Sequence, residues 1–212
     1  MVKGRDYDWG LPSKPFFTSE EERIRIETEN NVRLAEYVLD LIRDSDGTLT
    51  VSPEMVSTLH RLTIEGLYGH AGRFRRPGQY FEIGSSSHVP PAARELEGLV
   101  TEMCDYANQR SLVDPFHAAA YLLWRLAWIH PFEDGNGRVS RSVAYIALCV
   151  GFGLQELPGS IAIPDLILRH EDRYIAGLKD ADREWRLNHE VKVFQLEYLL
   201  SDLVVEQAGE DY

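Results

Sequence analysis

The chain has 212 residues, 44% of them hydrophobic, and its 34 Asp and Glu against 22 Lys and Arg give a net charge of −12. A chain of this length can bury a substantial core as one domain. Its acidic balance argues against nucleic-acid binding through phosphate neutralisation, since that mode needs clustered excess Lys and Arg. We therefore expect no nucleic-acid partner.

The two cysteines, Cys104 and Cys149, fall within apolar helical patterns. This placement favours buried thiols over a disulfide framework or a zinc site, and it predicts a cytoplasmic protein. The longest apolar stretch, 143–154, is well short of the roughly 20 residues that a membrane-spanning helix needs. The first residues hold no apolar run of the signal-peptide type. We therefore expect neither a membrane span nor export.

The amino-terminal third contains two predicted helices. Residues 1–18 lack periodicity and predict an irregular arm, whose Trp9, Phe16 and Phe17 are candidates for docking onto the body. A first helix is expected to begin after Ser19, a capping residue, and to stop near 46–47. The apolar positions that predict its buried face are Val32, Ala35, Val38, Leu39 and Ile42. A second helix starts at Ser52-Pro53 and runs towards the glycines at 69–72.

The pattern changes between residues 72 and 91, which we call the flap. Aromatic residues surround Pro77-Gly78, and GSSSHVPP follows, which predicts a short β-hairpin or loop beside a helical body. Helical spacing then returns in five segments. The first begins near Leu96, and the other four span about 114–129, 137–150, 164–181 and 190–207. These elements predict an all-α fold, a helical bundle with one small β-hairpin flap.

The chemistry is concentrated in the segment HPFEDGNGR, residues 130–138, which we call the motif loop. A helix delivers His130 from the end of its apolar face, and Pro131 stops that helix. Gly135-Asn136-Gly137 then supplies backbone N–H groups that can converge as a nest, directly before a new helix start. A helix start of this kind attracts phosphate.

Charged residues complete this candidate phosphate site. Arg138 and Arg141 lie three residues apart in the first turn of the next helix, where the macrodipole disfavours cations unless an anion is bound. Asp134 provides one hard carboxylate of the kind that ligates Mg²⁺ beside substrate phosphates. His130 is suited to act as general base near neutral pH. Taken singly, a histidine ending an apolar stripe and a Gly-Asn-Gly turn are ordinary structural features, so the hypothesis depends on their conjunction.

The segment HPFEDGNGRVSR, His130 to Arg141, resembles the Fic-domain signature HxFx(D/E)GNGRxxR at every specified position. LHRLTIEGLYGHAGRFR, residues 59–75, is similar to the segment that precedes the flap in that family. The resemblance covers about residues 52–185. It divides the chain into an irregular arm (1–18), an N-terminal helix region (19–51), a Fic domain (52–185) and a C-terminal helix with an acidic tail (186–212).

The resemblance implies a protein adenylyltransferase, an enzyme that uses Mg²⁺ and ATP to transfer AMP to a Ser, Thr or Tyr hydroxyl of a target protein. Carried over by position, His130 would deprotonate that hydroxyl and Asp134 would hold Mg²⁺. The nucleotide phosphates would bind at Gly135, Asn136, Gly137, Arg138 and Arg141. Phe132 would pack inward, and the flap near Ser85–His88 would bind the target by backbone pairing.

Two alternatives stay open at this stage. Related domains transfer other phosphoryl-containing groups or remove AMP with nearly the same loop, and a toxin-like binding module held inactive by a separate protein is also compatible with these residues. The inhibitory motif (S/T)xxxE(G/N) of many relatives is incomplete here. Glu29-Asn30 and Glu65-Gly66 match its second half, but Arg25 and Arg61 occupy the Ser/Thr positions. Glu29 is the preferred candidate for an inhibitory glutamate, because its helix precedes the domain body.

Overall fold

The structure, a computed structural model, describes residues 14–48, 50–77, 88–111, 113–155, 157 and 161–209. Trp9, most of the arm and Ser85–Ser87 of the flap lie outside these residues. The α-helices of the described part are α1 (Glu20–Arg43), α2 (Pro53–Ile64), α3 (Leu96–Arg110), α4 (Pro115–Ile129), α5 (Asn136–Gly151), α6 (Ile163–Arg169), α7 (Glu171–Asn188) and α8 (Phe194–Gly209), and a 3₁₀ turn at Ala93–Glu95 precedes α3. The predicted all-α fold is confirmed.

Local side-chain chemistry sets the starts of three helices. The hydroxyls of Ser19 and Ser52 accept hydrogen bonds from the Glu22 and Met55 amides, at 3.2 and 3.1 Å. The Asp114 carboxylate accepts the His117 amide at 3.0 Å, and proline occupies the first turn of both α2 and α4. Each cap satisfies an amide that has no partner within the helix. The predicted starts of α1, α2 and α4 are therefore confirmed.

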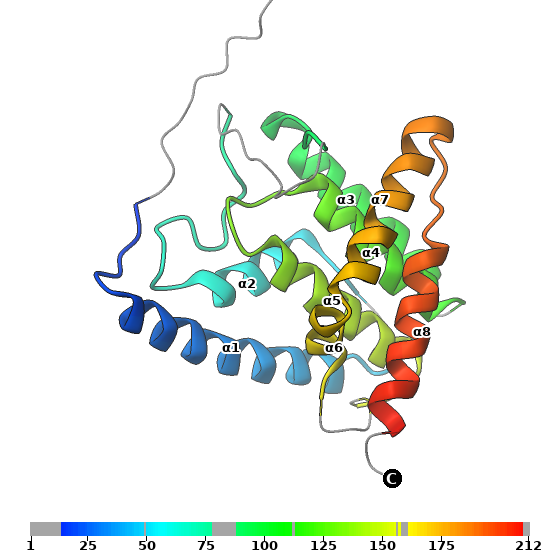
Figure 1. Cartoon of the computed structure of the whole chain (residues 1–212), viewed down its shortest axis with the longest axis horizontal. Coiled ribbons are helices and arrows are strands. Elements are labelled where there is room, and N and C mark those ends of the chain that lie inside the picture. Colours follow the sequence, from blue (N-terminus) through cyan, green and yellow to red (C-terminus); the bar gives the residue numbers. More distant parts are fainter. Residues whose placement is uncertain are drawn as a thin grey trace, which may run out of the picture.

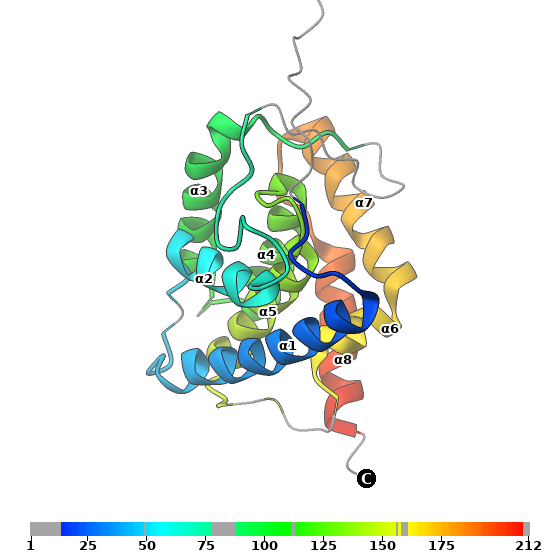
Figure 2. The same ribbon diagram turned by 90° about the vertical axis from the view of Figure 1, so that its left-hand side faces the viewer.

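Helices α4 and α5 form the centre of the molecule (Figure 1). In a view from the side, α3 and α7 stand on either side of α4, while α1 crosses the front below α2 (Figure 2). Helix α4 is buried over most of its length, from Ala118 to Leu126 and again at Ile129. The start of α4 meets the end of α5 closely, since a Cβ on Gly151 would lie 2.6 Å from the Pro115 Cβ. The two helices are therefore closely packed at the end of the pair opposite the loop that joins them.

The buried face of α1 differs from the predicted one. Leu34, Val38 and Ile42 are buried at intervals of four residues, whereas Val32 and Ala35 face solvent. The buried set also includes Asn30, whose Nδ2 donates to the carbonyl oxygens of Thr63 and Glu65 at 3.2 and 2.9 Å. The prediction was right at Val38 and Ile42 and wrong at Val32 and Ala35. It did not include Asn30, a polar residue that is buried where it satisfies backbone carbonyls.

Three further predictions need correction or fall outside the described residues. Helix α2 ends at Ile64, before the glycines that were expected to stop it. The predicted helix at 164–181 is two helices, because His170 leaves the helical region of backbone space at φ −104° and ψ 37°. Residues 72–77 and 88–91 of the flap contain no strand, and the rest of the predicted hairpin lies outside the described residues. Among the described residues, backbone β pairing occurs as a bridge between Pro15 and Tyr68.

The described helices also test the predictions on membranes and cysteines. No described helix is both long and apolar enough to cross a bilayer. Cys104 and Cys149 are buried free thiols, as expected. The core side chains run from Leu34 in α1 to Leu203 in α8, so the terminal helices pack on the same core as the central pair. The proposed domain boundaries stay a prediction.

Candidate functional site

The motif loop begins with a sharp change of direction at His130. The amide of His130 still donates to the Leu126 carbonyl at 2.9 Å, but its backbone adopts the left-handed conformation at φ 49° and ψ 58°. Non-glycine residues adopt this conformation rarely, mostly where neighbouring groups fix it. The main chain thereby turns from the end of α4 into the loop directly at the candidate base.

Phe132 and Asn136 hold the loop together from inside. The Asn136 side chain accepts the Phe132 amide at 3.0 Å and donates to the Phe132 carbonyl at 2.9 Å. Phe132 is fully buried, as expected, and its ring stacks on His60 with centroids 3.7 Å apart. Because the Asn136 side chain is used inside the loop, a contact with phosphate would come from its backbone N–H.

Helix α2 supports the loop from behind through His60. The Gly72 amide donates to His60 Nδ1 at 3.0 Å, and His60 Nε2 lies 3.1 Å from the Asp134 carbonyl oxygen, to which it donates. These two bonds fix a neutral tautomer, and burial lowers the pKa of His60 to about 3. Sequence reasoning did not identify this residue, although its place among Val56, Leu59 and Thr63 on the buried face of α2 was the available signal.

Gly135 starts α5 where no side chain fits. Its φ is +78°, and a Cβ there would lie 3.2 Å from Thr63 Cγ2, 3.3 Å from His60 Cδ2 and 3.3 Å from Ile64 Cγ2. Both the conformation and the close approach of α2 favour glycine at this position. The backbone amides at the start of α5 are thereby placed with no side chain between α2 and the loop.

The cations and the carboxylate of the motif lie on this same loop and helix start. Asp134 is 54% exposed, and its carboxylate contacts the Arg138 guanidinium at 3.3 Å. Arg138 also lies 3.8 Å from Glu27 of α1, which in turn pairs with Arg23 at 2.7 Å. The result is a chain of alternating charges from α1 to the motif loop.

Within the part of the chain that the structure describes, Arg141 differs from Arg138 in having no acidic partner. Burial lowers the pKa of the Arg141 guanidinium, and its Nη1 lies against Gly137, 3.1 Å from where a Cβ would stand. Among the described residues, Arg141 makes no ion pair or hydrogen bond. A mostly buried cation is costly unless an anion compensates it, so this side of the α5 start is built to receive one.

The candidate base is neutral over the physiological range. Burial lowers the pKa of His130 to about 4, and a hydrogen bond between the ring and the Ala127 backbone acts in the opposite direction. The nearby charge of Arg75 lowers this pKa further. A neutral imidazole can accept a proton, which is the state that a general base requires.

Residues 50–148 match the model of the Fic/DOC family. The chain contains a Fic/DOC domain. The motif loop, residues 130–138, lies inside the matched segment.

Similar proteins agree with this assignment. The protein adenylyltransferase Fic of Nematostella vectensis is 29% identical over 146 residues, which cover 65% of this chain and 29% of that protein. The protein of the same name from Drosophila willistoni is 36% identical over 100 residues, which cover 44% of this chain and 18% of that protein. This chain therefore spans well under half the length of these relatives.

Solved structures share the fold. The Fic domain containing signaling protein from Bacteroides thetaiotaomicron superposes with a TM-score of 0.71 at 21% identity, covering 91% of this chain and 73% of that chain. At this level of identity the match establishes the Fic fold, including helices outside residues 50–148, and no activity.

The motif loop, called the Fic loop from here on, supplies only part of a ligand set for Mg²⁺. Asp134 offers one exposed carboxylate beside the nest, and no group of three or more His, Cys, Asp or Glu side chains in the described residues could enclose a metal. Mg²⁺ commonly keeps several waters and binds through one or two carboxylates together with substrate phosphates. The residues present therefore fit a Mg²⁺ ion that arrives with its nucleotide.

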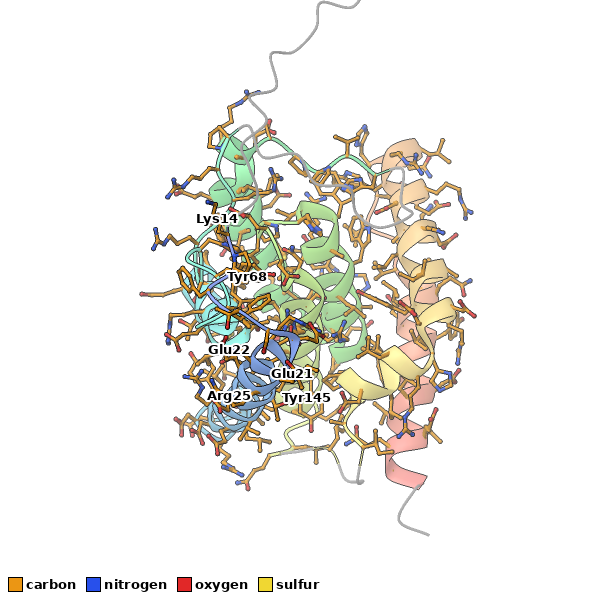
Figure 3. All side chains as sticks on the ribbon, turned by 60° about the vertical axis from the view of Figure 1, so that its left-hand side comes forward. Lys14, Glu21, Glu22, Arg25, Tyr68 and Tyr145 are labelled. Carbon is orange, nitrogen blue, oxygen red and sulfur yellow. The ribbon has the colours of Figure 1, made fainter. Side chains whose placement is uncertain are left out.

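The two glutamates weighed as inhibitory candidates pair with arginines other than Arg138 and Arg141. Glu29 is 56% exposed and pairs with Arg25 at 2.8 Å. Glu65 pairs with Arg33 at 3.1 Å and Arg61 at 3.5 Å. Glu29 thus pairs with an arginine of its own helix, and its role as an inhibitory glutamate stays a prediction; Arg25 is labelled in Figure 3.

Glu27 is the α1 carboxylate that contacts the Fic loop, at Arg138. Tyr68 lies on the same side of the molecule as the start of α1 in Figure 3, and the charges of Asp134, Glu27 and Arg138 act on its hydroxyl. Sequence reasoning missed Glu27 because no motif marks it. The helical period was the available signal, since Glu27 precedes the buried positions Leu34 and Val38 by about two and three turns.

The candidate target-binding residues of the flap are described in the structure only at His88. His88 Nε2 lies 2.7 Å from the Trp128 carbonyl oxygen, and its ring packs on the Trp128 ring at 5.3 Å. His88 is thus attached to the end of α4. Ser85 to Ser87 lie outside the described residues, so binding of a target near Ser85–His88 stays a prediction.

Proposed function

We propose that this chain is a protein adenylyltransferase, which transfers AMP from ATP to a Ser, Thr or Tyr hydroxyl of a target protein. The observation that carries the proposal is the largely buried Arg141, unpaired among the described residues, beside the glycine nest at the start of α5. A neutral His130 stands at the other end of the same loop. The names of the relatives support AMP as the transferred group.

The residues of the Fic loop would divide the work as follows. Backbone N–H groups of Gly135, Asn136 and Gly137 would bind phosphate oxygens at the helix start, where the macrodipole favours negative charge. Arg138 and Arg141 would neutralise the polyphosphate, and Asp134 would hold Mg²⁺, which supplies further positive charge at the phosphates. Binding of ATP would thus replace the internal contacts of Arg138 with Asp134 and Glu27.

The transfer step then needs one proton acceptor and one fixed phosphorus atom. His130 would take the proton from the target hydroxyl while its oxygen attacks the α-phosphorus in line. A bond forms between that oxygen and the phosphorus, and the bond to the bridging oxygen breaks, so pyrophosphate leaves. Most of the rate enhancement would come from positioning and charge neutralisation.

A labelling assay with a matched histidine control tests this proposal. Wild-type chain, His130→Ala and His170→Ala are incubated with ATP labelled in the adenine moiety, MgCl₂ and cell lysate. His170 is the control because it lies in a partly exposed pair with Glu206, at the junction of α6 and α7. We expect wild type and His170→Ala to label a protein, and His130→Ala to lose at least about 100-fold of the rate, as a removed general base does.

Intact-mass analysis of the labelled protein identifies the group. A mass increase of one AMP supports the proposal, while an increase of UMP or bare phosphate from a nucleotide panel would replace it. Equal labelling by wild type and His130→Ala would refute the role of His130 as base. Binding of the target protein by the flap near Ser85–His88, an inhibitory partner protein and a cytoplasmic location remain part of the proposal.

A further inference from the structure

Arg75 is an arginine with only 7% of its surface exposed, and its Nε and Nη2 groups both donate to main-chain carbonyls. Its Nε donates to the His130 carbonyl at 2.8 Å, and its Nη2 donates to the carbonyls of Pro91 and, at 3.4 Å, Ile129. Its own amide donates to the Pro131 carbonyl at 2.8 Å. Within the described ranges no carboxylate pairs with it. A buried arginine used in this way is uncommon, since buried arginines are usually paired with an acid.

These hydrogen bonds lie at the end of α4, where the backbone of His130 is left-handed. The carbonyls of Ile129 and His130 stand at the end of α4, where the helix leaves them without internal partners and its macrodipole is negative. His130 itself has the left-handed φ of 49°. Bonds to the carbonyls on both sides of its Cα therefore fix the two peptide planes that set the direction of its side chain.

The Nη2 group of Arg75 also reaches a different segment, at the Pro91 carbonyl. Pro91 precedes the 3₁₀ turn at Ala93–Glu95, and it stands with Arg75 on either side of residues 78–87 in the sequence. One planar group thus joins the chain on both sides of those residues to the end of α4. Only a fork of donors can serve these acceptors together, because an ammonium group offers a single point of charge.

We propose that Arg75 is a positioning residue for His130, which fixes the main chain on both sides of the base and ties it to the segment at Pro91. The inference rests on the proposed function, because it assigns Arg75 a part in delivering the base. Arg75 touches neither nucleotide nor target in this role. Its contribution is the direction of the imidazole.

Substitution can separate two properties of Arg75, its positive charge and its fork of N–H donors. Lysine keeps the charge and loses the fork, whereas glutamine loses the charge and most of the fork. Arg73→Gln is the matched control, because Arg73 is an exposed neighbour on the same segment. The other charged or titratable groups that act on His130 are His88 and Asp134, which all three variants leave in place.

Two measurements are made on the full chain. The first is an NMR titration of the His130 ring signals, assigned by their absence in His130→Ala. The second is the rate of AMP transfer together with the dissociation constant of a non-hydrolysable ATP analogue with Mg²⁺. For both Arg75 variants we expect a rate about 10- to 100-fold lower with the dissociation constant within about twofold, since misplacement of a reacting group costs rate more than ground-state binding.

The NMR signals give an answer that does not require activity. We expect the His130 ring shifts at pH 7 to change in both Arg75 variants and its pKa to rise only in Arg75→Gln, with Arg73→Gln like wild type in both respects. If Arg75→Gln does not fold, Arg75→Lys decides through the ring shifts and the rate. Wild-type ring shifts and rate in Arg75→Lys would overturn the inference.

Failure of the proposed function would give a different result from failure of the positioning role. In that case wild type itself transfers no AMP, while the dependence of the His130 signals on Arg75 is still measured. Unchanged ring shifts in the Arg75 variants, together with transfer by the wild type, would refute the positioning role alone.

Discussion

Replacement of Gly135 by alanine tests the close approach of α2 to the Fic loop. Two costs can be worked from the structure. Alanine at φ +78° carries the left-handed penalty of about 1–2 kcal/mol. The new methyl group would also stand 3.2 to 3.3 Å from Thr63, His60 and Ile64, and overpacking of this kind costs about 1–3 kcal/mol.

Gly153→Ala is the matched control. Gly153 has φ +67°, and nothing lies within 4 Å of the position that its Cβ would take, so only the conformational cost applies. We expect Gly153→Ala to lower the free energy of unfolding by about 1–2 kcal/mol and Gly135→Ala by about 2–5 kcal/mol. Equilibrium unfolding in urea, with both midpoints and slopes compared, measures the difference.

The two variants also differ in their expected effect on nucleotide binding. Gly135→Ala displaces the first amides of α5 and should weaken binding of the ATP analogue, whereas Gly153→Ala at the far end of α5 should leave binding unchanged. Equal losses of stability in the two variants would refute the reasoning, because the contact with α2 would then contribute nothing.

Two further predictions concern the charges around the Fic loop. Glu27→Gln removes the carboxylate beside Arg138 and should tighten binding of the ATP analogue up to about fivefold, the range of a partly exposed ion pair, whereas Glu29→Gln should not; equal dissociation constants would argue against the contact. Because His130 must be neutral to act as base and its pKa is lowered to about 4, kcat/KM should stay constant from pH 8 down to about pH 5 and fall as the pH drops through about 4. A pH–rate profile that loses half its value near pH 6.5 would contradict this.

The helix starts and the motif were readable from the sequence because their chemistry is local. Ser19, Ser52 and Asp114 each bind an amide three residues further along, so the cap and its partner appear in one short window. The motif loop likewise carries its glycines and its base within a single connection between two helices. Its closest internal bonds, from Asn136 to Phe132, also span only four residues.

Other features depended on which helix faces which, and local patterns were misleading there. The first helix was assigned an apolar face with Val32 and Ala35, yet the buried face continues through Asn30, whose amide group serves carbonyls near the end of α2. The segment 164–181 has helical spacing throughout, but its chain turns at His170 as α6 gives way to α7. Periodicity alone does not register such a turn.

What the sequence by itself determined is the set of reacting groups, with His130, the glycine nest and the arginines in fixed order. The tertiary structure decided how those groups are held and opposed, through His60 behind the loop, Arg75 at the His130 carbonyl and Glu27 beside Arg138. The physical reason is the distance along the sequence between the groups that contact each other. Caps and turns are satisfied within a few residues, whereas each of these three contacts joins segments that the folding of separate helices brings together.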